Sequence, residues 1–236
     1  MASLQMVGFD ADDTLWHSET WYQDAQEQFE ALLARYIDVG DAQVRERLLA
    51  TERANLRLFG YGAKGMTLSM IEAAIALTDA RIGGGDIHRI TEIGKGVLQH
   101  PVELLPGVRE AVETVAERHR VVLITKGDLF HQERKVAESG LADLFHRIEI
   151  VSEKDERTYA RLLEEFAVPA SRFAMVGNSY KSDIAPVLAL GGYGVHMPYH
   201  VLFGLEHMEA DASHPRLATV EQPSQIPGAI ERFAQA

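Results

Sequence analysis

The 236-residue sequence predicts an α/β fold, with a doubly wound parallel sheet as its core and an inserted domain made only of helices. Two patterns indicate this fold. From residue 106 onward, short apolar runs alternate with helical patterns, and these runs are too continuously apolar for a sheet with one face in water. Between residues 17 and 100, apolar side chains recur only at steps of three and four residues. We therefore expect a core domain of residues 1–16 and 101–236 and a helical domain of residues 17–100.

The first predicted strand is the apolar run Leu4–Phe9, which ends abruptly in a string of aspartates. Four helices are expected to follow it without an intervening strand, because breaks near Gly40, Gly60 and Gly83 divide the helical pattern. The apolar residues of these helices lie at about 21–36, 44–56, 66–82 and 87–93.

Beyond Pro106 the sequence predicts strands and helices in alternation. The helices are expected at about residues 106–119, 129–139, 157–166 and 184–190. The strands are the apolar runs Val121–Ile124, Ile148–Val151, Phe173–Val176, Tyr193–Val195 and Leu217–Val220. In sheets of this kind, ligands bind beyond the carboxyl ends of the strands. We therefore expect the chemistry of the protein directly after each apolar run.

Composition restricts the partners that this protein can have. Its formal net charge is −12 and no basic run is present, so binding to a nucleic acid is not expected. The absence of cysteine excludes disulfides, thiolate metal sites and thiol catalysis. No apolar run approaches the ~20 residues that cross a bilayer, and the amino-terminal residues lack the pattern of a signal peptide. We expect a soluble, cytoplasmic protein that acts on a small phosphorylated metabolite.

Different polar side chains follow the predicted strands. The sequence Asp10-Ala11-Asp12-Asp13-Thr14 follows the first strand, Thr125-Lys126-Gly127-Asp128 the second, Ser152-Glu153-Lys154 the third, and Gly177 to Asp183 the fourth. Each of these signals alone is common at protein surfaces. Because all four come at the ends of separate parallel strands, they are expected to converge on one site.

These residue types suit phosphoryl transfer through an enzyme carboxylate. Of two aspartates at i and i+2, one can attack phosphorus while the other protonates the leaving oxygen and later activates water. The Thr125 hydroxyl and the Lys154 ammonium can hold phosphoryl oxygens. Gly127, with Asp128 as a helix N-cap, offers backbone N–H groups to an anion. Mg²⁺ is the expected cofactor, since a cation must bring an anionic substrate against an anionic nucleophile.

At these residues the sequence resembles the haloacid dehalogenase-like (HAD) superfamily. Residues 10–14 are similar to its first motif, DxDxT. Thr125, Lys154 and the segment from Gly177 to Asp183 are similar to its second, third and fourth motifs, in the same order. The helical insertion is similar to a helical (C1-type) cap domain, so the resemblance covers essentially the whole chain. It implies a HAD/Rossmann-like core.

The resemblance also implies roles for individual residues. Asp10 is the expected nucleophile and Asp12 the expected acid and base. Asp10, the backbone carbonyl of Asp12 and Asp183 are the expected ligands of Mg²⁺. One departure concerns the metal, because Asn178 stands where the fourth motif usually has aspartate. Since an amide still offers an oxygen, we expect Asn178 to belong to a weaker or reshaped metal site.

A second departure is Asp155, which follows Lys154 where proline is common and is expected to change only the local turn. Thr14, Lys126 and Gly127 are further candidates for substrate binding. Lys126 is expected to lie behind the site, because adjacent side chains of an extended chain point to opposite sides.

In the helical domain, the loop of residues 59–64 is a candidate for substrate recognition. We expect Tyr61 or Lys64 to contact the part of the substrate remote from the phosphate. The alternative is a simple helix break, with Gly60 or Gly62 as a C-cap.

The leading function is a phosphatase that acts on a small phosphate ester. A phosphomutase, which returns the phosphoryl group to a substrate, is an alternative within the same chemistry. A haloacid dehalogenase would use the same nucleophile on carbon, but it would leave Asp12 idle because no leaving group needs protonation. A non-catalytic phosphate-binding protein is a fourth possibility, suggested by Asn178, although binding alone would not need the complete set of motif residues.

Overall fold

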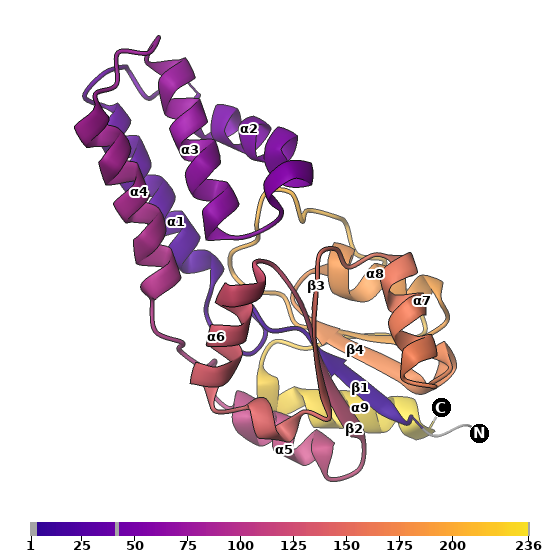
Figure 1. Ribbon diagram of the computed structural model, residues 1–236. Coiled ribbons are helices and arrows are strands. Elements are labelled where there is room, and N and C mark those ends of the chain that lie inside the picture. The colour runs from indigo at the N-terminus through magenta and orange to yellow at the C-terminus, as the bar shows by residue number, and fades with distance from the viewer. Residues whose placement is uncertain (1–3, 41–42, 236) are drawn as a thin grey trace. The chain divides into compact units, whose positions relative to one another are not determined.

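The computed structural model describes residues 4–40 and 43–235, and the chain divides into two compact units (Figure 1). One unit comprises Met1–His17, Val102–Lys126 and Gln132–Ala236, and the other comprises Ser18–Pro101 and Gly127–His131. Residues 1–3 lie outside the described part. They begin the amino-terminal segment that we expected to lack a signal peptide. None of the helices in the described ranges is long and apolar enough to span a membrane.

Six parallel strands in the described part of the first unit form one sheet, in the order β3-β2-β1-β4-β5-β6. The central strand is β1, in which Val7 pairs with Val121 of β2 on one side and with Ala174 of β4 on the other. The sheet is therefore doubly wound, as the sequence predicts. The strands are β1 (Met6–Phe9), β2 (Arg120–Lys126), β3 (Arg147–Val151), β4 (Phe173–Gly177), β5 (Tyr193–His196) and β6 (Leu217–Thr219).

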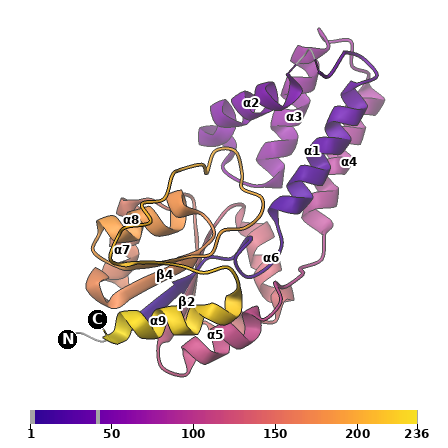
Figure 2. The same cartoon turned by 180° about the vertical axis from the view of Figure 1, so that it is seen from behind.

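Helices cover both faces of this sheet, which explains why its strands are apolar on both sides. Helices α5, α6 and α9 pack on one face, against side chains such as Val7 and Phe9. Helices α7 and α8 pack on the other, against side chains such as Met6 and Val122 (Figure 2). These helices are α5 (Val108–Ala116), α6 (Leu129–Ser139), α7 (Glu156–Glu165), α8 (Ala185–Ala189) and α9 (Ile226–Gln235).

The winding direction of the chain reverses between β1 and β4. From β1 the chain proceeds outward to β2 and β3, and it then returns to the other side of β1 to form β4. In doubly wound sheets, the connections at such a reversal leave a crevice at the carboxyl ends of the two strands. Asp10 follows β1 directly and Gly177 ends β4, so the predicted motifs lie at this crevice.

The second unit contains four α-helices in its described residues, and they share one apolar core. Phe29, Leu33, Met70 and Ile90 are completely buried in it. Each helix contributes an apolar stripe to this core, as expected from the spacing in the sequence. The helices are α1 (Glu19–Leu33), α2 (Val44–Phe59), α3 (Ala63–Leu77) and α4 (Gly84–Gln99).

Two boundaries differ from the prediction for physical reasons. The third helix ends at Leu77, short of Ile82, because Asp79 and Ala80 adopt left-handed backbone conformations that stop a right-handed helix. Helix α9 was not predicted at all, since Pro227-Gly228 suggests a break. In the structure this pair lies in the first turn of α9, where proline is tolerated.

Gly94 and Gly96 of α4 allow a direct test of the packing of the second unit. A Cβ atom at Gly94 would lie 1.8 Å from Oγ1 of Thr67 on α3, whereas nothing lies within 4 Å of a Cβ at Gly96. We expect Gly94→Ala to lower the free energy of unfolding by about 1–3 kcal/mol through overpacking. Gly96→Ala should raise it by about 1 kcal/mol, because alanine favours the helix.

Urea unfolding of the two variants, followed by circular dichroism, measures both effects. Equal changes in the two variants would contradict the close approach of α3 and α4.

Candidate active site

The centre of the predicted site is an ion cluster of Asp10, Lys154 and Asp183. The Lys154 ammonium donates to Oδ1 of Asp10 and to Oδ1 of Asp183, the latter at 2.7 Å. The three side chains come from the ends of β1, β3 and β4, and their exposed fractions are 9%, 2% and 1%. The sequence predicted that these three residues would converge, and the structure brings them into direct contact.

Charge is finely balanced in this cluster. Burial, and then the neighbouring Asp183, raise the pKa of Asp10 to about 7 against the opposing effect of Lys154. Burial alone would lower the pKa of Lys154, but the two carboxylates outweigh burial and raise it. Lys154 is therefore held as a cation between two acids.

Thr14 joins the first and fourth motifs. Its hydroxyl donates to Oδ2 of Asp10 at 3.2 Å and accepts from the backbone N–H of Asn178 at 3.0 Å. The side chain is completely buried. The Thr14 hydroxyl is thus placed to orient the Asp10 carboxylate, and the predicted contact of Thr14 with a substrate stays a prediction.

Asp183 is held in place by backbone of its own loop. The N–H of Ser179 donates to Oδ2 of Asp183 at 3.0 Å, which leaves Oδ1 to Lys154. Gly177 makes this approach possible, since a Cβ atom there would lie 2.3 Å from Cγ of Asp183. The glycine of the fourth motif is thus required by close packing against the carboxylate.

Asp12 is bound by three donors from the first unit. Trp16 Nε1 and Lys135 Nζ donate to Oδ1 at 2.6 and 2.5 Å, and Gln132 Nε2 donates to Oδ2 at 2.9 Å. Burial would raise the pKa of Asp12, but Lys135, helped by Gln132 and Trp16, outweighs burial and lowers it. These contacts favour the carboxylate form of Asp12.

Lys126 belongs to a separate buried network. Its ammonium donates to Glu206 at 2.7 Å and to Ser182 at 2.9 Å, and Glu206 also accepts from Ser179 at 2.6 Å. Lys126 was a further candidate for substrate binding, expected to lie behind the site. In the structure it joins the end of β2 to the fourth-motif loop and to the segment that carries Glu206, and its role in substrate binding stays a prediction.

The comparisons with known proteins identify the family. A family model described as haloacid dehalogenase-like hydrolase matches residues 4–191. The chain belongs to this family. It is therefore an enzyme of the hydrolase class. The comparison with curated proteins found no match to its sequence.

Solved structures similar to this hydrolase fall into more than one activity class. A haloacid dehalogenase-like hydrolase from Xanthomonas campestris is 56% identical, with a TM-score of 0.90 over 99% of this chain and 93% of that one. A 2-haloacid dehalogenase from Pseudomonas syringae is 22% identical, with a TM-score of 0.63 over 98% and 99%. The HAD-hydrolase YfnB from Bacillus subtilis, bound to magnesium, is 14% identical, with a TM-score of 0.63 over 97% and 99%. The last two show a common fold.

The donor set of the hydrolase fits a hard cation such as Mg²⁺. No group of three or more acidic, histidine or cysteine side chains in the described ranges forms a metal site. Asp10, Asp183 and Asn178 nevertheless offer only oxygen donors, and Mg²⁺ commonly takes one or two carboxylates and keeps several waters. Lys154 already holds positive charge between the two acids. Carboxylate oxygens that hold one cation in this way also suit a divalent metal ion.

Sequence reasoning placed the motif residues but missed those that orient them. Trp16 binds Asp12, as do Gln132 and Lys135. Gln132 and Lys135 are three residues apart on α6, so they lie on one face of the helix. This spacing was the only feature of the sequence that could have indicated a shared role. Glu206 comes from an irregular segment, and nothing in its sequence context marks it.

The remaining candidates can be placed in their own units. Thr125 is buried at the end of β2 in the first unit. Gly127, Tyr61 and Lys64 belong to the second unit, where Lys64 Nζ lies 2.9 Å from both carboxylate oxygens of Asp128. The predicted role of these three residues in substrate binding stays a prediction. Asp128 caps α6 as expected, since its Oδ1 accepts from the N–H of His131 at 3.0 Å.

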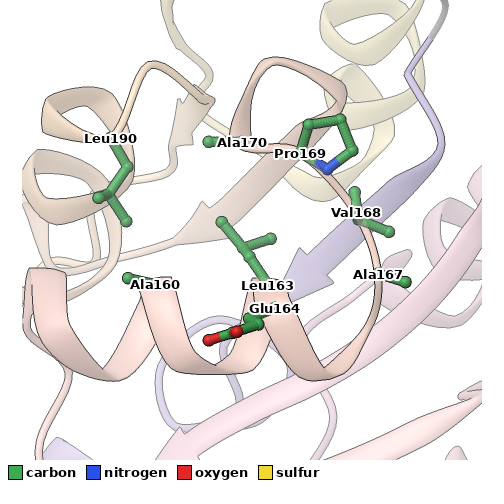
Figure 3. Close-up of a pocket in the computed structure, with 8 residues that line it drawn as sticks. All are labelled: Ala160, Leu163, Glu164, Ala167, Val168, Pro169, Ala170 and Leu190. Atoms are coloured by element: carbon green, nitrogen blue, oxygen red, sulfur yellow. The ribbon is translucent and has the colours of Figure 1, made fainter.

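A shallow pocket of 430 Å³ lies on another part of the first unit (Figure 3). Its wall combines Leu163 of α7 with Val168, Pro169 and Leu190. These residues come before β4 and β5, whereas the catalytic motifs come after the strands. The pocket is therefore at the opposite edge of the sheet from the ion cluster.

The ion pair of Glu206 predicts how the free energy of unfolding depends on pH. Burial would raise the pKa of Glu206, but Lys126 and the two serine hydroxyls lower it from 4.5 to about 2. At about 1.4 kcal/mol per pKa unit, this corresponds to about 3 kcal/mol of folding free energy. Because the pKa is lower in the folded state, this contribution is complete above pH 4.5 and is lost as the pH falls toward 2.

Urea unfolding of Glu206→Gln and wild type at several pH values measures this contribution. The variant should be about 2–3 kcal/mol less stable at pH 7, and the difference should shrink below pH 4.5. Glu153→Gln is a matched control, since Glu153 also pairs with Lys126 but is 46% exposed. We expect it to change stability by less than about 1 kcal/mol. A pH-independent difference for Glu206→Gln would contradict the assignment.

Proposed function

We propose that this hydrolase is a magnesium-dependent phosphatase that cleaves a small phosphate monoester through an aspartyl-phosphate at Asp10. The observation that carries the proposal is the second carboxylate, Asp12, which is 29% exposed and held by three donors. A hydrolase that attacks carbon and releases a halide needs no proton for its leaving group. A phosphatase does, because an alkoxide is a poor leaving group.

In the proposed mechanism, Asp10 attacks phosphorus through a carboxylate oxygen. Lys154 lies against this carboxylate, so its ammonium can bind a phosphoryl oxygen at the point of attack. Thr125, at the end of the neighbouring strand β2, is the expected second contact to the phosphoryl group. A bound Mg²⁺, held by Asp10, Asp183, Asn178 and the Asp12 carbonyl, would neutralise charge on the phosphate.

Asp12 moves the protons of both half-reactions. In the first, the bond from phosphorus to the leaving oxygen breaks and Asp12 gives that oxygen a proton. In the second, Asp12 takes a proton from the water whose oxygen attacks the aspartyl-phosphate, which frees Asp10 and phosphate. A phosphomutase would differ only in passing the phosphoryl group to a second substrate instead of water.

Dehalogenation is the second candidate, and one observation favours it. Lys154 contacts both acids, and Asn178 adds no negative charge. The cluster therefore needs a metal ion less than a cluster with a third aspartate would. In that reaction Asp10 would attack the carbon that carries the halogen. Halide release without a metal and phosphate release with Mg²⁺ distinguish the two candidates.

We further propose that the helical unit acts as a cap that supplies substrate contacts, including Tyr61 and Lys64. The support is its place in the sequence, inserted between the first two motifs, as in the cap of the family pattern. Lys64→Ala should therefore change KM for the best substrate.

Hydrolysis of p-nitrophenyl phosphate tests the proposal. Wild type should release phosphate only with Mg²⁺, and Asp10→Asn should lower kcat by at least about 10³-fold, because an amide cannot attack phosphorus. Asp143→Asn, an exposed aspartate of the same unit, is the control and should keep full activity. Chloride release from 2-chloropropionate without phosphatase activity would overturn the proposal in favour of dehalogenation.

A further inference from the structure

Helix α6 supplies two buried donors to Asp12. Gln132 and Lys135 are three residues apart and lie on one face of the helix. Their exposed fractions are only 3% and 6%. Asp12 is the acid that pairs with Lys135 in the described part of the chain, at 2.5 Å. Burial of an unpaired ammonium costs folding free energy. The buried Lys135 ammonium therefore needs the Asp12 carboxylate as its partner.

The three donors do not share the two oxygens of Asp12 equally. Oδ1 accepts from both Trp16 Nε1 and Lys135 Nζ, whereas Oδ2 accepts from Gln132 Nε2. A carboxylate oxygen has room for about two hydrogen bonds. Oδ1 is therefore saturated, and Oδ2 keeps one position for a further partner.

The amide of Gln132 is itself fixed in orientation. Its Nε2 donates to Asp12 Oδ2 at 2.9 Å and to the backbone carbonyl of Lys126 at 2.8 Å. Turning the amide over would set its own oxygen against these two acceptors. Both hydrogens of the amide are thus in use, and Gln132 ties Asp12 to the end of β2, the strand that carries Thr125.

We propose that Gln132 and Lys135, together with Trp16, are positioning residues that fix the Asp12 carboxylate and leave Oδ2 as the oxygen that exchanges protons with the substrate. This inference rests on the proposed phosphatase reaction. The proton on Oδ2 passes to the leaving oxygen as its bond to phosphorus breaks, and Oδ2 later takes a proton from the attacking water. Oδ1 stays bound to Trp16 and Lys135 throughout.

The positioning role predicts a dependence on the leaving group. Gln132→Leu and Lys135→Met free the Asp12 side chain to rotate, which misplaces Oδ2. We expect kcat for an alkyl phosphate, whose leaving oxygen needs the proton, to fall about 10²-fold. For p-nitrophenyl phosphate, whose leaving group is stable as an anion, the loss should be about fivefold or less, and KM should change little.

Arg134→Met is the matched control, because it removes a cation from the same helix that pairs with Glu138 at 3.3 Å instead of Asp12. It should lower the rates for both esters by less than about twofold. An equal loss for the two esters in Gln132→Leu and Lys135→Met would overturn the proposal, as would full activity of both variants on the alkyl ester.

A second measurement does not depend on activity. The chain has only two tryptophans, so its indole N–H signals can be separated by nitrogen-15 NMR. Trp16 Nε1 donates to Asp12, whereas the buried Nε1 of Trp21 has no hydrogen-bond partner among the described residues. Asp12→Asn and Lys135→Met should shift the Trp16 signal and leave the Trp21 signal in place.

The two measurements separate the possible failures. A Trp16 signal that neither variant moves would overturn the inference whatever the enzyme hydrolyses. A wild type that hydrolyses neither ester would contradict the proposed phosphatase, and with it the proton exchange at Oδ2. A wild type that hydrolyses both esters, with variants that keep its preference between them, would contradict the positioning role alone.

Discussion

The contact of one buried ammonium with two buried carboxylates is the constraint on which the rest of the structure depends. Lys154 lies against Asp10 and Asp183, and all three are almost closed to solvent. Removing one partner would leave a buried charge unpaired, which typically costs several kcal/mol. The ends of β1, β3 and β4 must therefore stay together, and the parallel sheet does this through its winding reversal between β1 and β4.

Around this cluster, each neighbouring residue settles the orientation of one charged group. Thr14 fixes the nucleophile, and Gly177 allows Asp183 to approach the backbone of its own loop. Lys135 neutralises Asp12 separately, so the two aspartates of the first motif do not share a single cation. Two acids with different partners can have different functions, which is what attack on phosphorus followed by proton transfer requires.

The fold and the catalytic centre could be predicted from sequence because both are local patterns. Most strands are apolar runs, and each motif segment follows such a run. The orienting residues could not be predicted in the same way. Lys135 looks like any polar residue of an amphipathic helix until the fold brings Asp12 beside it, and Glu206 lies in an irregular segment. The contact of Lys126 with Glu206 could not be predicted either, because the two residues are 80 positions apart along the chain.

The central claim is that Asp10 carries the phosphoryl group, and trapping that intermediate tests it most directly. An enzyme quenched during turnover of a phosphate ester can be reduced with borohydride, which converts an aspartyl-phosphate to homoserine. Mass spectrometry of the peptide that contains Asp10 should then show homoserine at position 10, and Asp10→Asn should show none. An unmodified Asp10 in actively turning-over enzyme, or an ester of Asp10 with the carbon of a 2-haloacid, would contradict the claim.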